Sequence, residues 1–323
     1  MRNGWVSGRA PATIANVGPG FDVFALAIHG LRDEVAIRPA DKDSLAVEGV
    51  GAESIPTKFP DNTAGIVINA LRAATGISQP LQIRVRKGIP PSRGLGSSAA
   101  SCAGAALAFL KAFPASRSLG AEGFIQAAVE GEAAVAARHY DNIAAALLGG
   151  FVTVASTDPL VLRRETVSSR VALAIAIPEV QLKTADMRRV LPDLVPLQDA
   201  VGNIGRAATL ALALSQGDVS LAGRCLEDRI VEPARASFIP GFAEAKAAAL
   251  AAGATGFAIS GSGSSVFAFA ASRFIAANVA KAMCDAFNAR GHRAAPLVTT
   301  VENAVPLGAV VEKSGPRFLV AAA

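Results

Sequence analysis

The order of apolar and polar positions predicts alternating strands and helices along the first half of the chain. Leu81–Arg86 alternates strictly, as a strand with one exposed face does. Residues 62–74 place apolar side chains at helical spacing behind Asn62, a good helix cap, and Gly76 ends this helix. Further strands are expected at Trp5–Ala10, Glu34–Arg38, Ser44–Gly49, Phe151–Ala155 and Leu160–Arg163, and further helices at Ala99–Ala112 and Ala121–Arg138.

The second half predicts an α+β sandwich. Val171–Ile177 is almost wholly apolar, which indicates a buried strand, and two more strands flank the glycine-rich turn Ser260–Ser264. Strands flanked by helices in this order favour a second domain, so we expect domains at 1–157 and 158–323. The other expected elements are strands at Thr255–Ile259, Val266–Ala270 and Ala294–Val301, helices at Leu182–Arg188, Asp199–Gln216, Val219–Leu226, Phe242–Ala252 and Arg273–Arg290, and a turn at Glu232–Arg235.

Composition narrows the class of protein. The 323 residues are 51% hydrophobic and 18% charged, with a net charge of +5, which is typical of a folded globular chain. Basic residues never run beyond two, and aromatics are 5%, so nucleic-acid binding is not expected. The N-terminus lacks the apolar core of a signal peptide, and no apolar run has the length of a membrane span. The three cysteines are widely spaced, so we expect a cytoplasmic protein.

The residues Lys87–Ala106 carry the strongest chemical signal. Pro90 and Pro91 force a loop after the preceding strand, and Gly94 and Gly96 allow a ligand to approach the backbone closely. Ser97 and Ser98 then stand where an alanine-rich helix begins, and serine is a favoured N-cap. Free backbone amides at a helix N-terminus form an anion site, most naturally for phosphate. A serine hydroxyl there could also bind magnesium.

Three other interpretations compete with a phosphate site at this stretch. It is not a P-loop, because GxxxxGK[ST] is absent. Gly94–Ala99 does satisfy the dinucleotide pattern G-x-G-x-x-A, but the preceding strand ends in two prolines and no acidic residue follows at the expected distance. A simple Gly/Ser turn entering a helix remains open on the local sequence.

Four segments spread over almost the whole chain carry a family resemblance. They are Pro11–Asp22, Pro90–Ala100, Gly131–Glu132 with His139–Ile143, and Ala258–Phe267. In this order they resemble the GHMP small-molecule kinases, and within them the homoserine kinases. This resemblance implies an N-terminal ribosomal S5-like domain and a C-terminal ferredoxin-like α/β sandwich. It implies transfer of the γ-phosphoryl group of ATP to the side-chain hydroxyl of L-homoserine, a step towards threonine.

The same resemblance assigns the nucleotide and metal ligands. Ser98 and Glu132 are expected to hold Mg²⁺, with Glu130 as the alternative ligand or a solvated side chain. The separation of Glu132 from His139 is only six residues and lacks the small Gly/Ser turn of the family, which counts against Glu132. The residues expected to contact ATP are Pro90, Pro91, Ser92, Arg93, Gly94, Leu95, Gly96, Ser97, Ser98, Ala99 and Ala100. Asn62 is added on its position alone, because the segment before its helix is expected to approach the adenine or ribose.

Homoserine carries a carboxylate and an ammonium group. Arg188 and Arg235 fit the family's positions for the carboxylate, because guanidinium binds carboxylate through paired hydrogen bonds. Asn16 and Asp22 are expected to bind the ammonium, although turn chemistry is an equal explanation for both. The remaining expected site residues are His139, which lines the pocket or caps a helix, Asn142, which orients the reacting hydroxyl, Asp141 as a candidate general base, and Thr184 near the phosphate or hydroxyl.

Two other functions stay open. One is a GHMP kinase that acts on another small alcohol, such as a sugar or an isoprenoid. The other, less favoured, is a basic RNA-binding protein, because the S5-like fold also occurs in ribosomal proteins. A homodimer is implied by the family alone.

Overall fold

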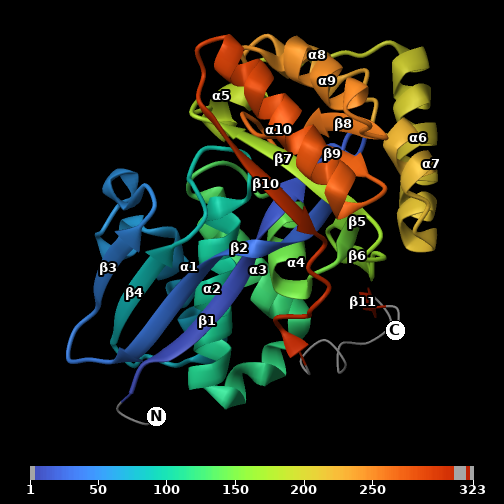
Figure 1. Cartoon of the computed structure of the whole chain (residues 1–323). Coiled ribbons are helices and arrows are strands. Elements are labelled where there is room, and N and C mark those ends of the chain that lie inside the picture. Colours follow the sequence, from blue (N-terminus) through green and yellow to red (C-terminus); the bar gives the residue numbers. More distant parts are fainter. Residues whose placement is uncertain (1–3, 309–317, 321–323) are drawn as a thin grey trace.

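In the computed structural model, which describes residues 4–308 and 318–320, two sheets lie one above the other (Figure 1). The larger sheet has the strand order β11-β6-β5-β2-β4-β3, with β1 paired to β2. The smaller has the order β10-β7-β9-β8. The chain changes sheets between Glu165 and Ala172, because β6 pairs with β5 in the larger sheet. The predicted boundary between residues 157 and 158 lies in the turn that joins these two strands.

The larger sheet is built on one long strand, β2, which runs Phe24–Pro39. It pairs antiparallel with β1, Val6–Ala15, over nearly the whole length of β1. The strand expected at Trp5–Ala10 is longer than predicted, because its pairing continues to Ala15 through a shift in register between Pro11 and Ala12. The other strands of this sheet are β3 Ser44–Gly49, β4 Leu81–Lys87, β5 Phe151–Thr157, β6 Leu160–Glu165 and β11 Phe318–Val320.

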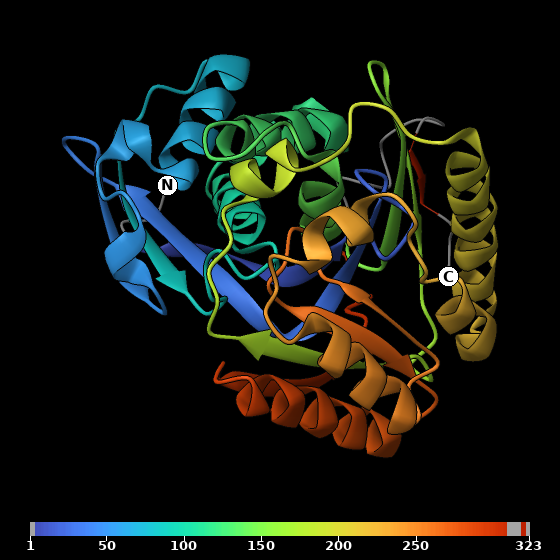
Figure 2. The ribbon, with the colours of Figure 1, turned by 90° about the horizontal axis from the view of Figure 1, so that it is seen from above.

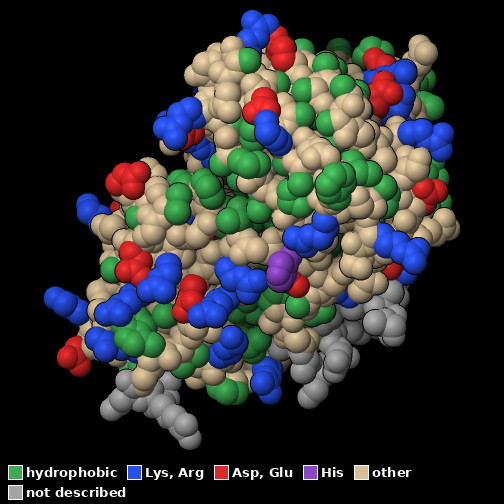
Figure 3. All heavy atoms as spheres, viewed as in Figure 1, with side chains coloured by type: hydrophobic (Ala, Val, Ile, Leu, Met, Phe, Trp, Pro, Cys, Tyr) green, Lys and Arg blue, Asp and Glu red, His purple; other side chains and the backbone are tan. Residues whose placement is uncertain are grey.

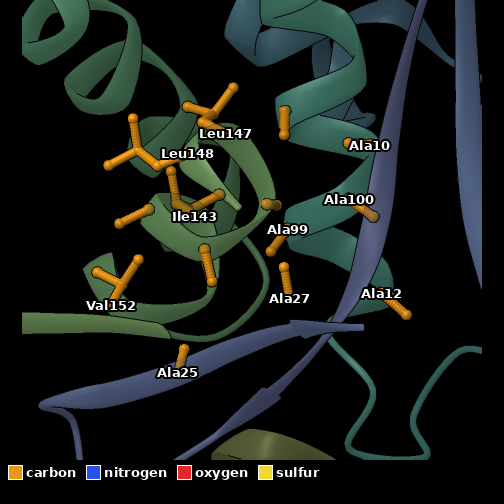
Figure 4. Close-up of a cluster of buried hydrophobic side chains, with 14 of the residues drawn as sticks. Ala10, Ala12, Ala25, Ala27, Ala99, Ala100, Ile143, Leu147, Leu148 and Val152 are labelled. Carbon is orange, nitrogen blue, oxygen red and sulfur yellow. The ribbon is translucent and has the colours of Figure 1, made fainter. Parts of the chain in front are cut away.

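Four helices cover one face of the larger sheet. Small residues, alanine and glycine, let the central helix approach the strands closely. Helix α2, Ser97–Ala112, contacts β1 and β2. A Cβ on Gly8 would lie 2.2 Å from the Gly104 carbonyl oxygen, so only glycine permits this approach. Figure 4 shows Ala100 of α2 on the side toward Ala10 and Ala12 of β1, and Ala99 on the side toward Ile143 of α4. The other three helices are α1 Thr63–Thr75, α3 Gly120–Ala133 and α4 Tyr140–Leu148, with short 3-10 turns at Ala52–Ser54, Phe59–Asp61 and Pro114–Leu119.

The smaller sheet has ferredoxin-like order, with its first and third strands in the centre. Its strands lie where the apolar pattern predicted strands, and all of them pair antiparallel. Figure 2 shows α9 and α10 side by side on its outer face, while its other face lies toward the larger sheet. The strands are β7 Ala172–Pro178, β8 Gly256–Ile259, β9 Val266–Ala270 and β10 Ala294–Thr300, and the two helices are α9 Phe242–Ala251 and α10 Arg273–Ala289.

Most of the remaining helices follow the predicted positions. They are α5 Thr184–Arg189, α6 Leu197–Gln216, α7 Val219–Arg224 and α8 Val231–Ala236. The turn predicted at Glu232–Arg235 is wrong, because these residues form α8. Asp228 explains the difference, since its carboxylate accepts hydrogen bonds from the amides of Val231 and Glu232 and so begins a helix.

The exposed face of the larger sheet is basic but not uniformly so. Figure 3 shows Lys and Arg side chains gathered over it with Asp and Glu among them. Arg9 pairs with Glu34 and Arg86 with Glu48. In the described part of the chain no single helix is long and apolar enough to cross a membrane. One bent pair, Ser97–Ala112 with Pro114–Ala133 at 118°, passes by length and composition when taken together.

Candidate functional site

A cavity of about 330 Å³ brings together side chains from both halves of the chain. That volume suits a small-molecule site. Nearly every residue singled out from the sequence lines it, from Asn16 in the first loop to Arg235 in α8. Four do not, namely Pro90, Ala99, Ala100 and Glu130, the alternative metal ligand. The side chains of Ala99 and Ala100 are buried in the core, so only the amide of Ala99 remains available for their predicted nucleotide role.

The predicted phosphate loop is held by backbone contacts on both sides. Gly94 lies against the second glycine-rich turn, Ser260–Ser264. The Ser260 hydroxyl of this turn donates to the Gly94 carbonyl oxygen at 2.6 Å. A Cβ on Gly94 would lie 2.1 Å from the Ser260 carbonyl oxygen. On the other side, the Thr13 amide donates to the Leu95 carbonyl at 3.1 Å. These contacts fix the loop, and the second glycine turn therefore supports the loop besides lining the cavity.

The helix begins one residue earlier than serine capping predicted. Gly96 is the N-cap, with φ 64°, and it offers no side-chain hydrogen bond. Ser97 and Ser98 are the first helical residues, and the Ser97 hydroxyl donates instead to the Ile89 carbonyl. The capping role predicted for these serines is wrong because only glycine tolerates the left-handed conformation beside β1. The amides of the first helical turn have no partner within the helix and point toward the cavity end of α2.

We expect Gly96→Ala to destabilise the protein and abolish activity. A Cβ at this position would lie 1.9 Å from Thr13 Oγ1, in addition to the strain of a positive φ. Gly76→Ala is the matched control, because Gly76 has φ 73° and open space around its Cβ position. The control should cost about 1 kcal/mol in urea unfolding, and Gly96→Ala clearly more. Equal losses for the two variants would contradict the close packing of the loop.

Glu132 of α3 is buried and lines the cavity beside Ser98, at the start of α2. Ser98 donates a hydrogen bond to it, while Oε2 has no partner among the described residues. Burial raises the pKa of Glu132 to about 7, against the lowering effects of Ser98 and the positive charge of Lys87. Glu130 is on the surface, where it pairs with Arg138. An unpartnered buried carboxylate oxygen beside a serine hydroxyl suits a divalent cation.

A buried ion pair below the loop was missed by the sequence analysis. Lys87 Nζ contacts the Asp33 carboxylate and donates to the Ser97 carbonyl at 2.8 Å and the Ser101 hydroxyl at 2.7 Å. Asp33 also accepts from the Ser101 hydroxyl and from two backbone amides at the start of the loop. Burial lowers the pKa of Lys87, and Asp33 opposes this.

A signal for this pair was present in the strand pattern. Lys87 continues the buried face of β4, two residues after Val85, and Asp33 continues the buried face of β2, two residues before Val35. Oppositely charged residues at buried positions of neighbouring strands indicate an ion pair. Here that pair joins two strands to the N-terminus of α2.

Asn142 and Asp141 stand at the start of α4, facing the phosphate loop. The Thr13 hydroxyl donates to Asn142 Oδ1 at 2.6 Å, which fixes the orientation of this side-chain amide. Burial raises the pKa of Asp141 to about 7. The backbone amide of Asn142 donates to the Asp141 carboxylate at 2.8 Å, which lowers the pKa and opposes part of this shift. Thr13 was not singled out from the sequence. An amide and a carboxyl group with a pKa near neutrality are thus placed beside the loop.

The opposite end of the cavity carries charges of both signs. Arg188 of α5 forms a bidentate ion pair with the Asp22 carboxylate. Its Nη1 also donates to His139 Nε2 at 2.8 Å. Because a guanidinium can only donate, Nε2 must accept, so His139 is neutral with its proton on Nδ1. Burial lowers the pKa of His139, as do the nearby arginines, while Asp22 raises it. This end therefore holds a carboxylate and a guanidinium with opposite charges side by side.

Arg235 lies deeper at this end and is held by backbone. Its Nε donates to the Met187 carbonyl at 3.1 Å and its Nη1 to the Gly261 carbonyl at 3.0 Å. Burial lowers its pKa to about 10. Arg188 and Arg235 both lie 5.3 Å from the ring centre of Phe21, which was not singled out from the sequence. The ring therefore offers a cation–π contact to both positive charges.

The loop between β1 and β2 is strained in a way typical of binding sites. Asn16, Val17 and Asp22 all have positive φ although none is glycine. The Asn16 side chain donates to the Gly261 carbonyl and accepts from the Asp22 amide, so it shapes the loop and closes it on the C-terminal half. Two other predicted residues also make protein contacts. Asn62 caps α1, and the Thr184 hydroxyl lies 3.3 Å from that of Ser262.

Comparison with known proteins places this cavity in a family. Residues 62–150 match the model of the GHMP kinases N terminal domain, and residues 210–289 match that of the GHMP kinases C terminal. Homoserine kinase from Halobacterium salinarum is 41% identical over 297 residues, covering 92% of this chain and 94% of that protein. At 15% identity and a TM-score of 0.66, a galactokinase from Lactococcus lactis, covering 93% of this chain and 94% of that chain, shares the fold alone.

A solved structure agrees with these matches. The crystal structure of homoserine kinase from Cytophaga hutchinsonii superimposes with a TM-score of 0.87 at 37% identity, covering 94% of this chain and 96% of that one. The predicted resemblance and two-domain α+β fold are thereby confirmed. The chain belongs to the GHMP kinases and, within them, to the homoserine kinase family.

Proposed function

We propose that this protein phosphorylates the side-chain hydroxyl of L-homoserine with ATP, giving O-phospho-L-homoserine and ADP in threonine biosynthesis. One observation carries the choice of substrate. One end of the cavity is lined by Asp22 and two arginines, Arg188 and Arg235. The other end is lined by the phosphate loop with its free backbone amides. A zwitterionic amino acid fits between these opposite charges, with its ammonium on Asp22 and Asn16 and its carboxylate on the arginines. Its side chain then points toward the loop.

ATP is the phosphoryl donor of this kinase family, and the loop suits its phosphates. The amides of Gly94–Ser98 and the positive end of the α2 dipole would neutralise charge on the phosphates. The cavity wall near Asn62 and Pro91 is the candidate contact for the ribose or adenine. The triphosphate would then extend along the loop toward α4.

Glu132 and Ser98 are the residues that would hold Mg²⁺. The unpartnered Oε2 of Glu132 fits this role, and a cation bound with ATP phosphates needs only one or two protein oxygens. When bound, the ion would neutralise charge that develops on the transferring phosphoryl group. The raised pKa of Glu132 means that its carboxylate is only partly ionised near neutral pH, so a cation would favour the ionised form.

The reaction needs the homoserine hydroxyl aligned with the γ-phosphorus. Asn142, oriented by Thr13, is placed to hold this hydroxyl, and Thr184 lies across the cavity. The hydroxyl oxygen forms a bond to the γ-phosphorus as the bond from that phosphorus to the bridging oxygen of ADP breaks. Asp141, with a pKa near 7, is the candidate acceptor for the hydroxyl proton.

Arg235→Leu should raise the KM for homoserine about 30-fold or more with a smaller effect on kcat, because a buried charge partner of the carboxylate is lost. Steady-state kinetics at saturating ATP measure both constants. Arg189→Leu is the control, since Arg189 is exposed on the neighbouring α5 and pairs only with Asp186 among the described residues. An unchanged KM in Arg235→Leu would contradict the carboxylate assignment.

A panel of acceptor alcohols tests the proposed function. With ATP and magnesium, we expect ADP release with L-homoserine and little with mevalonate or galactose, because neither carries an ammonium group for Asp22. Turnover of mevalonate or galactose without homoserine would favour a GHMP kinase of another specificity. Tight RNA binding that weakens steeply with salt, without ATP turnover, would favour the RNA-binding alternative.

We also propose how the chain divides into two domains. The strands through β6, together with β11, and helices α1–α4 would form the ATP-binding domain, and the chain from β7 to β10 the C-terminal domain, with the boundary at residues 166–171. The three cysteines are free and buried, which suits a cytoplasmic location.

A further inference from the structure

Three consecutive carbonyl groups of the phosphate loop are held by the C-terminal half of the chain. The Leu182 amide donates to the Ser92 carbonyl at 3.2 Å, and the Ser265 amide donates to the Arg93 carbonyl at 3.1 Å. The next carbonyl accepts from the second glycine-rich turn. All three donors belong to the chain that follows β7. The loop is therefore part of the contact between the two halves as well as of the cavity.

The side chain of Arg93 adds a fourth contact with the same half. Its Nη1 donates at 2.9 Å to the carbonyl of Pro178, the last residue of β7. The guanidinium is half-buried there, and burial lowers the pKa of Arg93, while the charge of Glu179 opposes this shift. The sequence predicts a contact of Arg93 with ATP, whereas this hydrogen bond turns the guanidinium toward the backbone of the smaller sheet.

Residues 178–183 form a short connection that leads from β7 to α5. The phosphate loop holds this connection near both ends. At the first end Arg93 binds the Pro178 carbonyl, and at the second the Ser92 carbonyl accepts from the Leu182 amide. Because the bound positions are so close in sequence, the connection has little freedom to move independently of the loop.

Helix α5 carries two of the residues proposed to bind homoserine. Thr184 is its first residue and Arg188 lies about one turn later, and both line the cavity. Arg188 also pairs with Asp22, so α5 contacts the loop between β1 and β2. A contiguous chain of hydrogen bonds therefore joins the nucleotide end of the cavity to the homoserine end.

We propose that Arg93 is a positioning residue that couples the two substrate sites, because it ties the phosphate loop to the connection that carries α5. When ATP fixes the loop, Arg93 holds α5 in the position that binds homoserine. This coupling rests on the proposed function and adds that the two substrates bind more tightly together than apart. Since such linkage is reciprocal, homoserine must tighten nucleotide binding by the same factor.

Titration calorimetry of the full chain measures the coupling. L-homoserine should bind the wild-type protein at least about 5-fold more tightly when a non-hydrolysable ATP analogue and magnesium are present. Arg93→Met keeps the length of the side chain but removes its donors, so the ratio of the two dissociation constants should fall below about 2. The affinity of this variant for the ATP analogue alone should stay close to the wild-type value.

Two further variants separate coupling from a loss of packing. Arg93→Lys retains a donor for the Pro178 carbonyl, so it should recover part of the ratio, which a purely structural role would not require. Arg86→Gln is the matched control and should keep the full ratio, because Arg86 is exposed on β4 and pairs with Glu48.

The outcomes distinguish this proposal from the proposed function. A wild-type protein that binds both ligands without coupling, or an unchanged ratio in Arg93→Met, would overturn the proposal and leave the kinase function standing. Weaker binding of the ATP analogue alone in Arg93→Met would also overturn it, because Arg93 would then act on the phosphates. A wild-type protein that binds neither ligand would contradict the proposed function itself, and the coupling with it.

Discussion

Glu132→Gln should lower kcat about 100-fold or more while leaving the protein folded. The substitution keeps the shape of the side chain and the hydrogen bond from Ser98, but it removes the negative charge of a carboxylate whose Oε2 has no partner among the described residues. Loss of one such group that acts on a developing charge typically costs two to three orders of magnitude. Kinetics at saturating homoserine and ATP measure this effect.

The same variant should be more stable than the wild type without ligands at alkaline pH. The pKa of Glu132 is raised from 4.5 to about 7, so the folded state binds its proton more tightly than the unfolded state does. Wild-type stability therefore falls as pH rises from about 4.5 to about 7, and the full penalty, on the order of 3 kcal/mol, is present above pH 7. Glutamine removes that penalty, and urea unfolding at pH 6 and pH 8 would reveal it.

Glu130→Gln is the matched control for both measurements. Glu130 lies on the same helix, exposed and paired with Arg138, so the variant should keep its turnover and its stability within about 0.5 kcal/mol. Turnover near the wild-type rate in Glu132→Gln would contradict the metal role. A greater loss in Glu130→Gln would transfer that role to Glu130.

Lys87→Met should destabilise the protein by about 3–5 kcal/mol, the usual result of leaving a buried charge without its partner. The lost ammonium leaves Asp33 buried, and it also releases the Ser97 carbonyl at the start of α2. Because the phosphate loop lies between these anchors, the KM for ATP should rise as well. Urea unfolding and steady-state kinetics measure the two effects.

A double variant distinguishes two causes of the lost stability, the unpaired buried charge and the missing hydrogen bonds. Lys87→Met/Asp33→Asn should regain part of the stability, because no unpaired charge remains. Lys111→Met serves as the control, since Lys111 is exposed and donates only to the Ser7 carbonyl among the described contacts, and it should change stability by less than about 1 kcal/mol. A loss of similar size in Lys111→Met and Lys87→Met would contradict the anchoring role of Lys87.

Local sequence signals predicted most elements because they act within a few residues. The alternation in β4 and the Asn62 cap with the Gly76 stop gave those elements close to their observed bounds. The cavity lining was also largely predictable, since glycines at 94 and 96 and the motif residues carry their chemistry locally. Family resemblance supplied their grouping, which spacing alone does not.

What the sequence did not reveal depends on contacts between distant segments. Thr13 orients Asn142 across 129 positions. Asp228 turns the predicted turn at Glu232–Arg235 into α8, and the close approach of β1 makes Gly96, not a serine, the N-cap. The charges of Lys87 and Asp33 obscured their places on buried strand faces. Each of these features is set by tertiary packing, which local propensity does not encode.

A crystal structure with L-homoserine and a non-hydrolysable ATP analogue tests the central claim most directly. We predict phosphate oxygens within hydrogen-bond distance of the Gly94–Ser98 amides. The homoserine carboxylate should lie on Arg188 and Arg235, and its hydroxyl should lie beside Asn142 and face the γ-phosphorus. A nucleotide bound away from this loop, or homoserine with its hydroxyl directed away from the γ-phosphate, would contradict the account.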